Sequence, residues 1–381
     1  MKKIAIFLLM LMILISNCVV VKAEDNFLSN GRAGLLMEID SGEILFSKNK
    51  DERLAVASMT KMMGLIIIME KLENGEIELD DIVTTSKNAS GMGGSQIYLE
   101  TGEKMTIRDL IKGITMASAN DATVAMAERI AGSEEKFVEM MNDKVKELGL
   151  KNTHFVNSTG LDEDNHYSSA YDMTIIAKEL LSHETILDFT SVYEDYLRVD
   201  TPNKFWLVNT NKLVRLYEGA DGLKTGFTDD ALYCMAVTAK RDGMRLIAIV
   251  LGEPKGSIRN EEISELLDYG FNTYKINNFM EKDSVVDEIN FEKGTKDKVN
   301  IYLKDNASVL MKQSDNISGY DTEIKLNNIS LPLKNGDVVG KFLIKKNNSV
   351  VNQIDLIIKE DVKEKSFLEL FIDILKNTLF I

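Results

Sequence analysis

The chain has 381 residues, with 60 acidic against 45 basic side chains and a formal net charge of −15. This length suggests about two domains, and the acidic balance argues against binding to nucleic acid and against broad attraction to anionic lipid. The sequence has no glycine-rich phosphate-binding loop. Its three histidines, His154, His166 and His183, show no paired ligand spacing, so we predict no metal and no other cofactor.

The first 23 residues are predicted to form a secretory signal. Lys2 and Lys3 precede the apolar stretch Ile4–Val21, and Val21-Lys22-Ala23 fits a small-residue cleavage site. Cleavage would change the net charge from −15 to −18 (−15 − 3). Cys234 would then be the one remaining cysteine, which makes no internal disulfide, and an exported domain of this size needs none. An uncleaved membrane anchor is the alternative.

The stretch from Ser58 to Leu72 predicts a helix that ends at Asn74-Gly75. Its inner part, Met62–Met69, is almost wholly apolar, which indicates a buried helix. Ser58 and Lys61 are three residues apart and therefore share one helix face. A serine becomes a nucleophile when a neighbouring base takes its proton. The helix N-terminus and partial burial both disfavour a charged ammonium, which suits Lys61 as that base. The alternative is an N-cap serine followed by a solvated lysine.

Ser118 and Asn120 lie between two predicted helices, Thr106–Thr115 and Asp121–Ala131. A hydroxyl and an amide at such a junction can relay a proton and contact a substrate backbone. The alternative is a capping or turn role between the two helices.

Lys224-Thr225-Gly226-Phe227 is predicted to form a strand. Asp221-Gly222 precedes it as a turn, and a β-hairpin follows, with strands at Leu232–Ala239 and Met244–Leu251. We place the segment on the same sheet, at the edge of a cleft. An ordinary edge strand with a protective lysine is the alternative.

The first three residues of this segment suit the binding of a carboxylate. Lys224 supplies a cation, Thr225 a hydroxyl, and Gly226 leaves room for a backbone to approach. The backbone N–H groups of Phe227 and Ser58 are candidate donors to an oxyanion.

Each of the three strings is weak evidence alone, but their order and spacing are specific. They begin at Ser58, Ser118 and Lys224, which are 60 and 106 residues apart (118 − 58 and 224 − 118). The ordered set is the signature of penicillin-binding proteins and class A β-lactamases.

Residues 28–275 resemble the penicillin-binding domain of the low-molecular-mass serine D-alanyl-D-alanine carboxypeptidases, the DacA/DacF-like family. Further matching stretches are Gly94-Ser95-Gln96-Ile97, Lys151-Asn152-Thr153-His154-Phe155, Thr159-Gly160-Leu161, Asp221-Gly222-Leu223 and Lys240-Arg241-Asp242-Gly243.

The resemblance implies an α+β fold of the β-lactamase/transpeptidase type, with an antiparallel sheet flanked by helices. It implies that Ser58 attacks the last peptide bond of a peptidoglycan stem peptide ending in D-Ala-D-Ala, and that β-lactams are covalent inhibitors. Catalytic roles carry over to Ser58, Lys61 and Ser118, and substrate contacts to Asn120, Lys224, Thr225, Gly226 and Phe227. The chain departs from the family at Ala119 (often glycine), Val56 (often proline) and Phe227 (histidine in some members).

Three other functions use the same motifs. A β-lactamase needs rapid deacylation, and the chain shows no clear Glu-x-x-x-Asn segment of the kind that class A enzymes use for it. A D,D-endopeptidase would cut cross-linked peptidoglycan with the same residues. A β-lactam-binding protein with little catalysis is the third, against which the intact Ser58, Lys61 and Lys224 argue.

After residue 277 the pattern changes to short strands with polar turns, which predicts a small all-β sandwich over 278–360 that follows the enzyme domain at 24–277. It contains no constellation of reactive groups, so we predict a spacer or docking module. The expected strands are Lys298–Leu303, Ala307–Lys312, Thr322–Leu326, Val338–Ile344 and Gln353–Ile358.

The tail, residues 361–381, predicts an amphipathic helix over Ser366–Ile381. Apolar side chains recur at helical spacing, and the helix is too short to span a bilayer. We expect it to lie in the outer leaflet of the plasma membrane, on the extracytoplasmic face; a secreted protein whose helix docks on the β domain or in a dimer is the alternative. The apolar positions are Phe367, Leu370, Phe371, Ile374 and Leu375.

Overall fold

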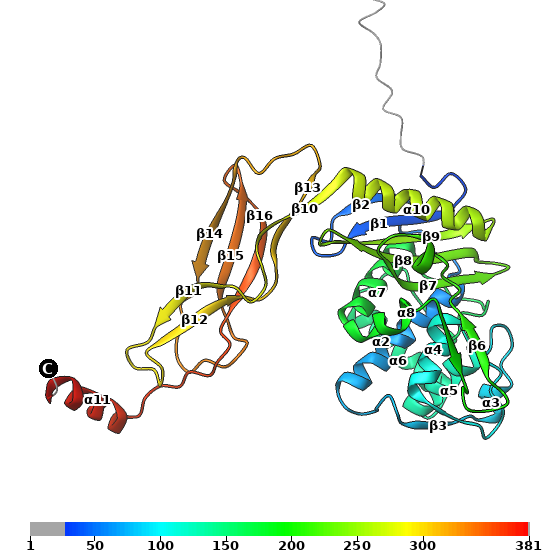
Figure 1. The fold of residues 1–381 in the computed structure, drawn as a ribbon, viewed down its shortest axis with the longest axis horizontal. Coiled ribbons are helices and arrows are strands. Elements are labelled where there is room, and N and C mark those ends of the chain that lie inside the picture. The colour runs from blue at the N-terminus through cyan, green and yellow to red at the C-terminus, as the bar shows by residue number, and fades with distance from the viewer. Residues whose placement is uncertain (1–26, 380–381) are drawn as a thin grey trace, which may run out of the picture.

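The structure is a computed structural model that describes residues 27–379. The predicted signal lies outside the described residues. Two units follow one another along an elongated molecule: a mixed helix-and-sheet unit, then a smaller all-β unit that ends in a helix (Figure 1).

The first unit is built on a five-stranded antiparallel sheet in the order β2-β1-β9-β8-β7. The predicted hairpin is confirmed as β8 and β9, and the segment containing Lys224 is confirmed as strand β7 at the edge of the same sheet. The strand bounds are β1 Ala33–Glu38, β2 Ile44–Lys48, β7 Ala220–Thr228, β8 Leu232–Arg241 and β9 Met244–Glu253.

Helices cover both faces of this sheet because successive side chains of its central strands point to opposite faces. On β9, Ile247, Ile249 and Leu251 belong to the larger core. Leu246, Ala248 and Val250 belong to the core under α10, Gly256–Thr273. The larger core is filled by α2 Lys61–Glu73, α4 Ile107–Met116, α5 Asn120–Ala131, α6 Glu134–Glu147 and α7 Ala170–Ser182.

Shorter elements surround the helical layer. Two small hairpins pair β3 with β4 and β5 with β6. The bounds are β3 Ile82–Thr84, β4 Lys104–Thr106, β5 Glu194–Leu197, β6 Phe205–Val208, η1 Ala57–Thr60, α3 Lys87–Ser90, η2 Glu184–Ile186, α8 Leu187–Thr190 and α9 Leu213–Leu216.

The second unit confirms the predicted all-β architecture. A five-stranded sheet, in the order β11-β12-β16-β15-β14, packs through a shared apolar core against the pair β10 and β13. All five predicted strands are present; β10 and β11 are additional. The bounds are β10 Tyr274–Met280, β11 Val285–Asn290, β12 Lys298–Leu303, β13 Ala307–Lys312, β14 Tyr320–Leu326, β15 Val338–Lys346 and β16 Ser349–Ile357.

A final helix, α11 Phe367–Leu379, follows the β unit. Ser366 and Glu369 form a capping box at its start: the Ser366 N–H donates to the Glu369 carboxylate at 2.7 Å, and the Glu369 N–H donates to Ser366 Oγ at 3.4 Å. Among the described residues, every helix is too short or too polar to cross a bilayer.

Candidate active site

Ser58 and Lys61 lie side by side where η1 leads into α2. Lys61 Nζ donates to Ser58 Oγ at 2.8 Å and to the Thr159 carbonyl at 2.6 Å. Ser58 is in a 3-10 turn just ahead of the α-helix, rather than within its first turn as predicted. The Lys61 side chain is fully buried, so the alternative of a solvated lysine is wrong.

The environment of Lys61 favours a neutral amine. Burial is the largest cause that lowers its pKa well below the usual value, and the charge of Lys224 lowers it further, while Asp121 opposes the shift. A neutral amine 2.8 Å from a hydroxyl can accept that hydroxyl's proton.

Ser118 lies in the loop between α4 and α5, in a left-handed backbone conformation with φ of 61°. Its Oγ accepts a hydrogen bond from Lys224 Nζ at 2.9 Å. The N-cap of α5 is Ala119, and within the described chain no side chain caps this helix. Ser118 therefore does not cap the helix, although it does lie in the turn between the two helices.

Asn120 is fixed by two loop carbonyls. Its N–H donates to the Ser95 carbonyl at 2.7 Å and its side-chain Nδ2 to the Gly93 carbonyl at 2.8 Å. Its Oδ1 is buried and has no hydrogen-bond partner among the described residues. Buried acceptors are rarely left without a partner, so this oxygen is available to a substrate N–H.

Lys224 and Thr225 point from β7 toward different neighbours. Lys224 Nζ contacts Ser118 Oγ and the Thr225 carbonyl, both at 2.9 Å, while Thr225 Oγ1 donates to Thr210 Oγ1 at 2.8 Å. Lys224 is 1% exposed, so it is not a protective lysine on an ordinary edge strand. Burial, with a smaller contribution from the charge of Arg259, lowers the Lys224 pKa to about 7.

Gly226 lets β7 approach the nucleophile turn. A Cβ at this position would lie 2.8 Å from the Val56 carbonyl oxygen and 3.3 Å from the Ser58 nitrogen. The backbone that approaches Gly226 is therefore the chain's own. Phe227, the next residue, is half exposed and its ring packs on Tyr233, with 4.4 Å between centroids.

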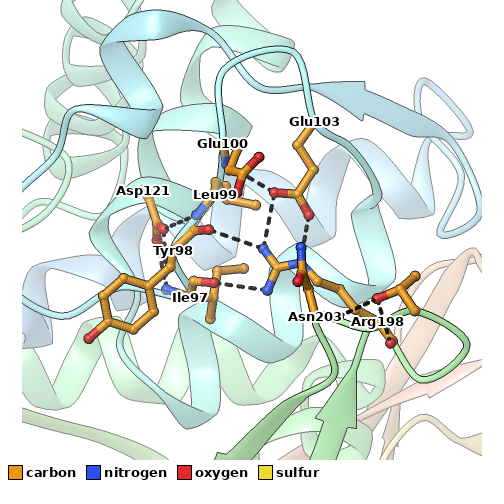
Figure 2. Close-up of polar contacts among 9 residues, drawn as sticks. Ile97, Tyr98, Leu99, Glu100, Glu103, Asp121, Arg198 and Asn203 are labelled. Carbon is orange, nitrogen blue, oxygen red and sulfur yellow. Dashed lines mark hydrogen bonds and ion pairs between the residues drawn. The ribbon is translucent and has the colours of Figure 1, made fainter.

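The loop that holds Asn120 is itself clamped from two sides (Figure 2). The Ile97 and Leu99 N–H groups donate to the Asp121 carboxylate at 3.2 and 2.9 Å. Arg198 donates to the Ile97 carbonyl at 3.0 Å and to both carboxylate oxygens of Glu103, at 2.6 and 3.1 Å. The clamp connects the Asn120 loop to the β5–β6 hairpin.

Sequence reasoning gave no site role to three residues that position this site, Thr159, Thr210 and Arg198, although Thr159 lies in a stretch that matches the family. Thr159 acts through its backbone carbonyl, which no residue type encodes. Thr210 lies between two asparagines, and a polar triplet does not by itself indicate burial. Arg198 is separated from Glu103 by 95 residues, so the pairing is visible only in the fold.

The fold and the site are typical of one class of protein, the serine acyl-transfer enzymes: a serine and a buried lysine are in contact beside the outer strand of an antiparallel sheet. The sequence comparisons identify the family. Residues 21–255 match the D-alanyl-D-alanine carboxypeptidase family, and residues 274–364 match the C-terminal domain of penicillin-binding protein 5. The chain belongs to the D-alanyl-D-alanine carboxypeptidase family, as its sequence motifs suggested.

Similar proteins cover almost the whole chain. The chain is 46% identical to the D-alanyl-D-alanine carboxypeptidase DacF of Bacillus subtilis, over 94% of this chain and 91% of that protein. It is 33% identical to DacC of Escherichia coli, over 89% and 86% of the two chains. The crystal structure of penicillin-binding protein 5 from Haemophilus influenzae superposes with a TM-score of 0.71 at 31% identity, covering 88% of this chain and 98% of that one. This protein is therefore a carboxypeptidase that removes the terminal D-alanine from peptidoglycan stem peptides in cell-wall maturation.

Proposed function

We propose that the hydrolysis proceeds through an acyl-enzyme on Ser58. Lys61 accepts the Ser58 proton, and Ser58 Oγ attacks the carbonyl carbon of the terminal D-Ala-D-Ala bond. The D-alanine amine leaves with a proton, and water then hydrolyses the Ser58 ester. The proposal rests chiefly on the 2.8 Å contact between a buried Lys61 Nζ and Ser58 Oγ.

The other residues have supporting roles in this mechanism. Lys224 and Thr225 hold the terminal carboxylate, and the free Oδ1 of Asn120 accepts from the substrate backbone. Ser118, 2.9 Å from Lys224 Nζ, passes a proton to the leaving amine. The N–H groups of Ser58 and Phe227 stabilise the oxyanion, and losing one such donor typically costs ~100-fold or more in rate.

The lysine pair predicts the pH dependence of kcat/KM. On the acid side, activity should rise with pH as Lys61, whose pKa is lowered by burial, loses its proton and becomes a base. On the alkaline side, activity should fall as pH rises through about 7, because Lys224 then loses the charge that holds the carboxylate. The measurement is kcat/KM for D-alanine release across this range.

A Lys224→Arg variant is the matched control for the alkaline limb. Arginine stays charged throughout the range, so the fall near pH 7 should disappear even where the plateau is lower. An unchanged alkaline limb in this variant would remove Lys224 from the proposed role.

The carboxypeptidase should be distinguished from the related activities with three substrates. We expect D-alanine release from a diacyl-L-Lys-D-Ala-D-Ala peptide, little cleavage of cross-linked dimers, and a penicilloyl adduct on Ser58 that lasts minutes. A relative, penicillin-binding protein D2 of Listeria monocytogenes, has been solved in an ampicillin-bound form. Faster cleavage of dimers would favour the endopeptidase, and immediate loss of the adduct the β-lactamase. A lasting adduct without D-alanine release would favour a binding protein.

We further propose that the protein is exported and attaches to the outer face of the membrane through α11. The support is the exposure of large apolar side chains on this helix: Phe367 is 85% and Leu368 66% exposed. The helix also lies at the far end of the β unit from the catalytic unit, which would set the catalytic unit away from the bilayer (Figure 1).

Truncation before α11 should abolish lipid binding and spare catalysis. A protein of residues 24–381 should sediment with phosphatidylcholine vesicles, and one of residues 24–365 should stay in the supernatant. A lipid without net charge suffices, because binding would rest on apolar burial. The double variant Phe367→Ser/Phe371→Ser keeps the full chain and removes two of its apolar side chains. It should also fail to sediment with the vesicles. Equal sedimentation of all three, or a dimer that the truncation dissolves, would favour the protein-docking alternative.

A further inference from the structure

The C-terminal ends of α2 and α7 meet at a group of ionisable side chains that the hydrolytic site does not use. One potential ligand atom of each of Glu70, Glu179 and His183 lies within 4.8 Å of the other two. We propose that these three residues bind one divalent transition-metal ion, with Zn²⁺ as the ion to test.

His183 is the residue that distinguishes this group from an ordinary acidic cluster. It is 6% exposed, and its Nδ1 lies 2.9 Å from a Glu73 carboxylate oxygen. Its Nε2 is buried without a hydrogen-bond partner among the described residues. Glu73 can only accept, so the proton of a neutral imidazole belongs on Nδ1 and the lone pair on Nε2. A ring whose second nitrogen donates to a carboxylate is the usual form of a metal-binding histidine.

The two carboxylates complete a donor set that suits zinc. Glu179 is in the last turn of α7 and His183 directly follows the helix, so both side chains lie at its C-terminal end. Glu70 comes from α2, which packs on α7. One imidazole and two carboxylates leave a fourth position for water, as in tetrahedral zinc sites with three protein ligands. The prediction of no metal was based on the spacing of the histidines and did not consider the Glu179–His183 pair.

The charges around the group favour a cation. Glu73 lies beside His183, and Glu179 lies with Glu70 and His183. The lysine at this place, Lys144, contacts a Glu70 oxygen at 2.6 Å and a Glu147 oxygen at 2.7 Å. One lysine leaves most of this negative charge unbalanced. The C-terminal ends of two helices add partial negative charge at the same place. A bound divalent ion would offset both.

The ion would link two helices without touching the reaction. Ser58 and Lys61 are at the N-terminal end of α2 and Glu70 is in its last turn, so the helix separates them by roughly 15 Å at 1.5 Å per residue. The expected consequence is therefore greater stability of the helical layer, with no role in hydrolysis.

Calorimetric titration of tag-free, chelator-treated protein with ZnCl₂ tests the proposal. We expect one Zn²⁺ per chain, a Tm that rises with Zn²⁺ concentration, and much weaker binding of Mg²⁺, which prefers oxygen ligands. Glu179→Gln and His183→Gln should each weaken the affinity at least ~10-fold, and Glu73→Gln should weaken it ~10–100-fold by releasing the imidazole.

Glu147→Gln is the matched control, because it removes a neighbouring charge and keeps all three ligands. Its affinity should stay within about threefold of the wild-type value, since one exposed charge contributes little. His183 is buried, and its replacement can disturb folding. The deciding variant is therefore Glu179→Gln, because Glu179 is partly exposed, and circular dichroism checks that this variant is folded. Absence of Zn²⁺ uptake by the wild type, or equal affinity in folded Glu179→Gln, overturns the proposal.

Discussion

Replacing Ser58 with alanine should abolish D-alanine release, with kcat falling on the order of 10⁴-fold or more. The reason is that no acyl-enzyme can form: the attacking oxygen is lost, while Lys61 and the other residues of the site remain. Losses of this size are typical when the nucleophile of a hydrolase is removed. The measurement is D-alanine release from diacyl-L-Lys-D-Ala-D-Ala, together with covalent labelling by a fluorescent penicillin.

Ser191→Ala is the matched control for this variant. Ser191 is an exposed serine whose hydroxyl donates to the Leu187 carbonyl at 2.7 Å, and its loss should leave activity unchanged. Labelling should disappear only in Ser58→Ala. Retained labelling in that variant would mean that another side chain is the nucleophile, and the proposed mechanism would fail.

Local sequence predicted the parts of the site that depend on secondary structure. The apolar stretch Met62–Met69 indicated a buried helix, and burial is the largest cause of the lowered Lys61 pKa. The hairpin signal at Arg241-Asp242-Gly243 placed Lys224 on the sheet edge. The 3-10 turn at Ser58 was not predictable, because it depends on contacts from β7 at Gly226 and from Gly160, whose Cβ would lie 1.9 Å from the Ala57 carbonyl oxygen.

Long-range pairing accounts for most of what the sequence did not reveal. The Arg198–Glu103 clamp and the Thr225–Thr210 contact join segments that are far apart in the chain, and neither segment carries a local pattern. In the β unit, β11 was missed because its partly buried residues, Val286 and Ile289, are three apart, so it lacks the alternation of a half-buried strand. Hydrophobic periodicity was thus enough to predict the helices and strands of the core, but not the long-range contacts that orient the side chains of the site.

Replacing Lys61 with methionine should lower kcat/KM on the order of 10²–10⁴-fold, the usual contribution of a general base. Methionine keeps most of the side-chain length in a fully buried position and removes the amine. The wild-type acid limb should vanish with the base. Burying Lys61 costs stability below its unfolded pKa, because unfolding lets it take up a proton that the folded state disfavours.

Because of this cost, the Lys61→Met variant should lose activity while its thermal stability stays close to that of the wild type. Relief of the cost should offset the lost bonds to Ser58 and Thr159, so we expect a Tm within about 4 °C of the wild type, which is about 2 kcal/mol for a unit of this size. Lys71→Met, on the same helix and paired with Glu76 at 2.6 Å, should keep full activity. A Lys61→Met variant that stays folded and active, with its acid limb intact, would show that another group takes the Ser58 proton.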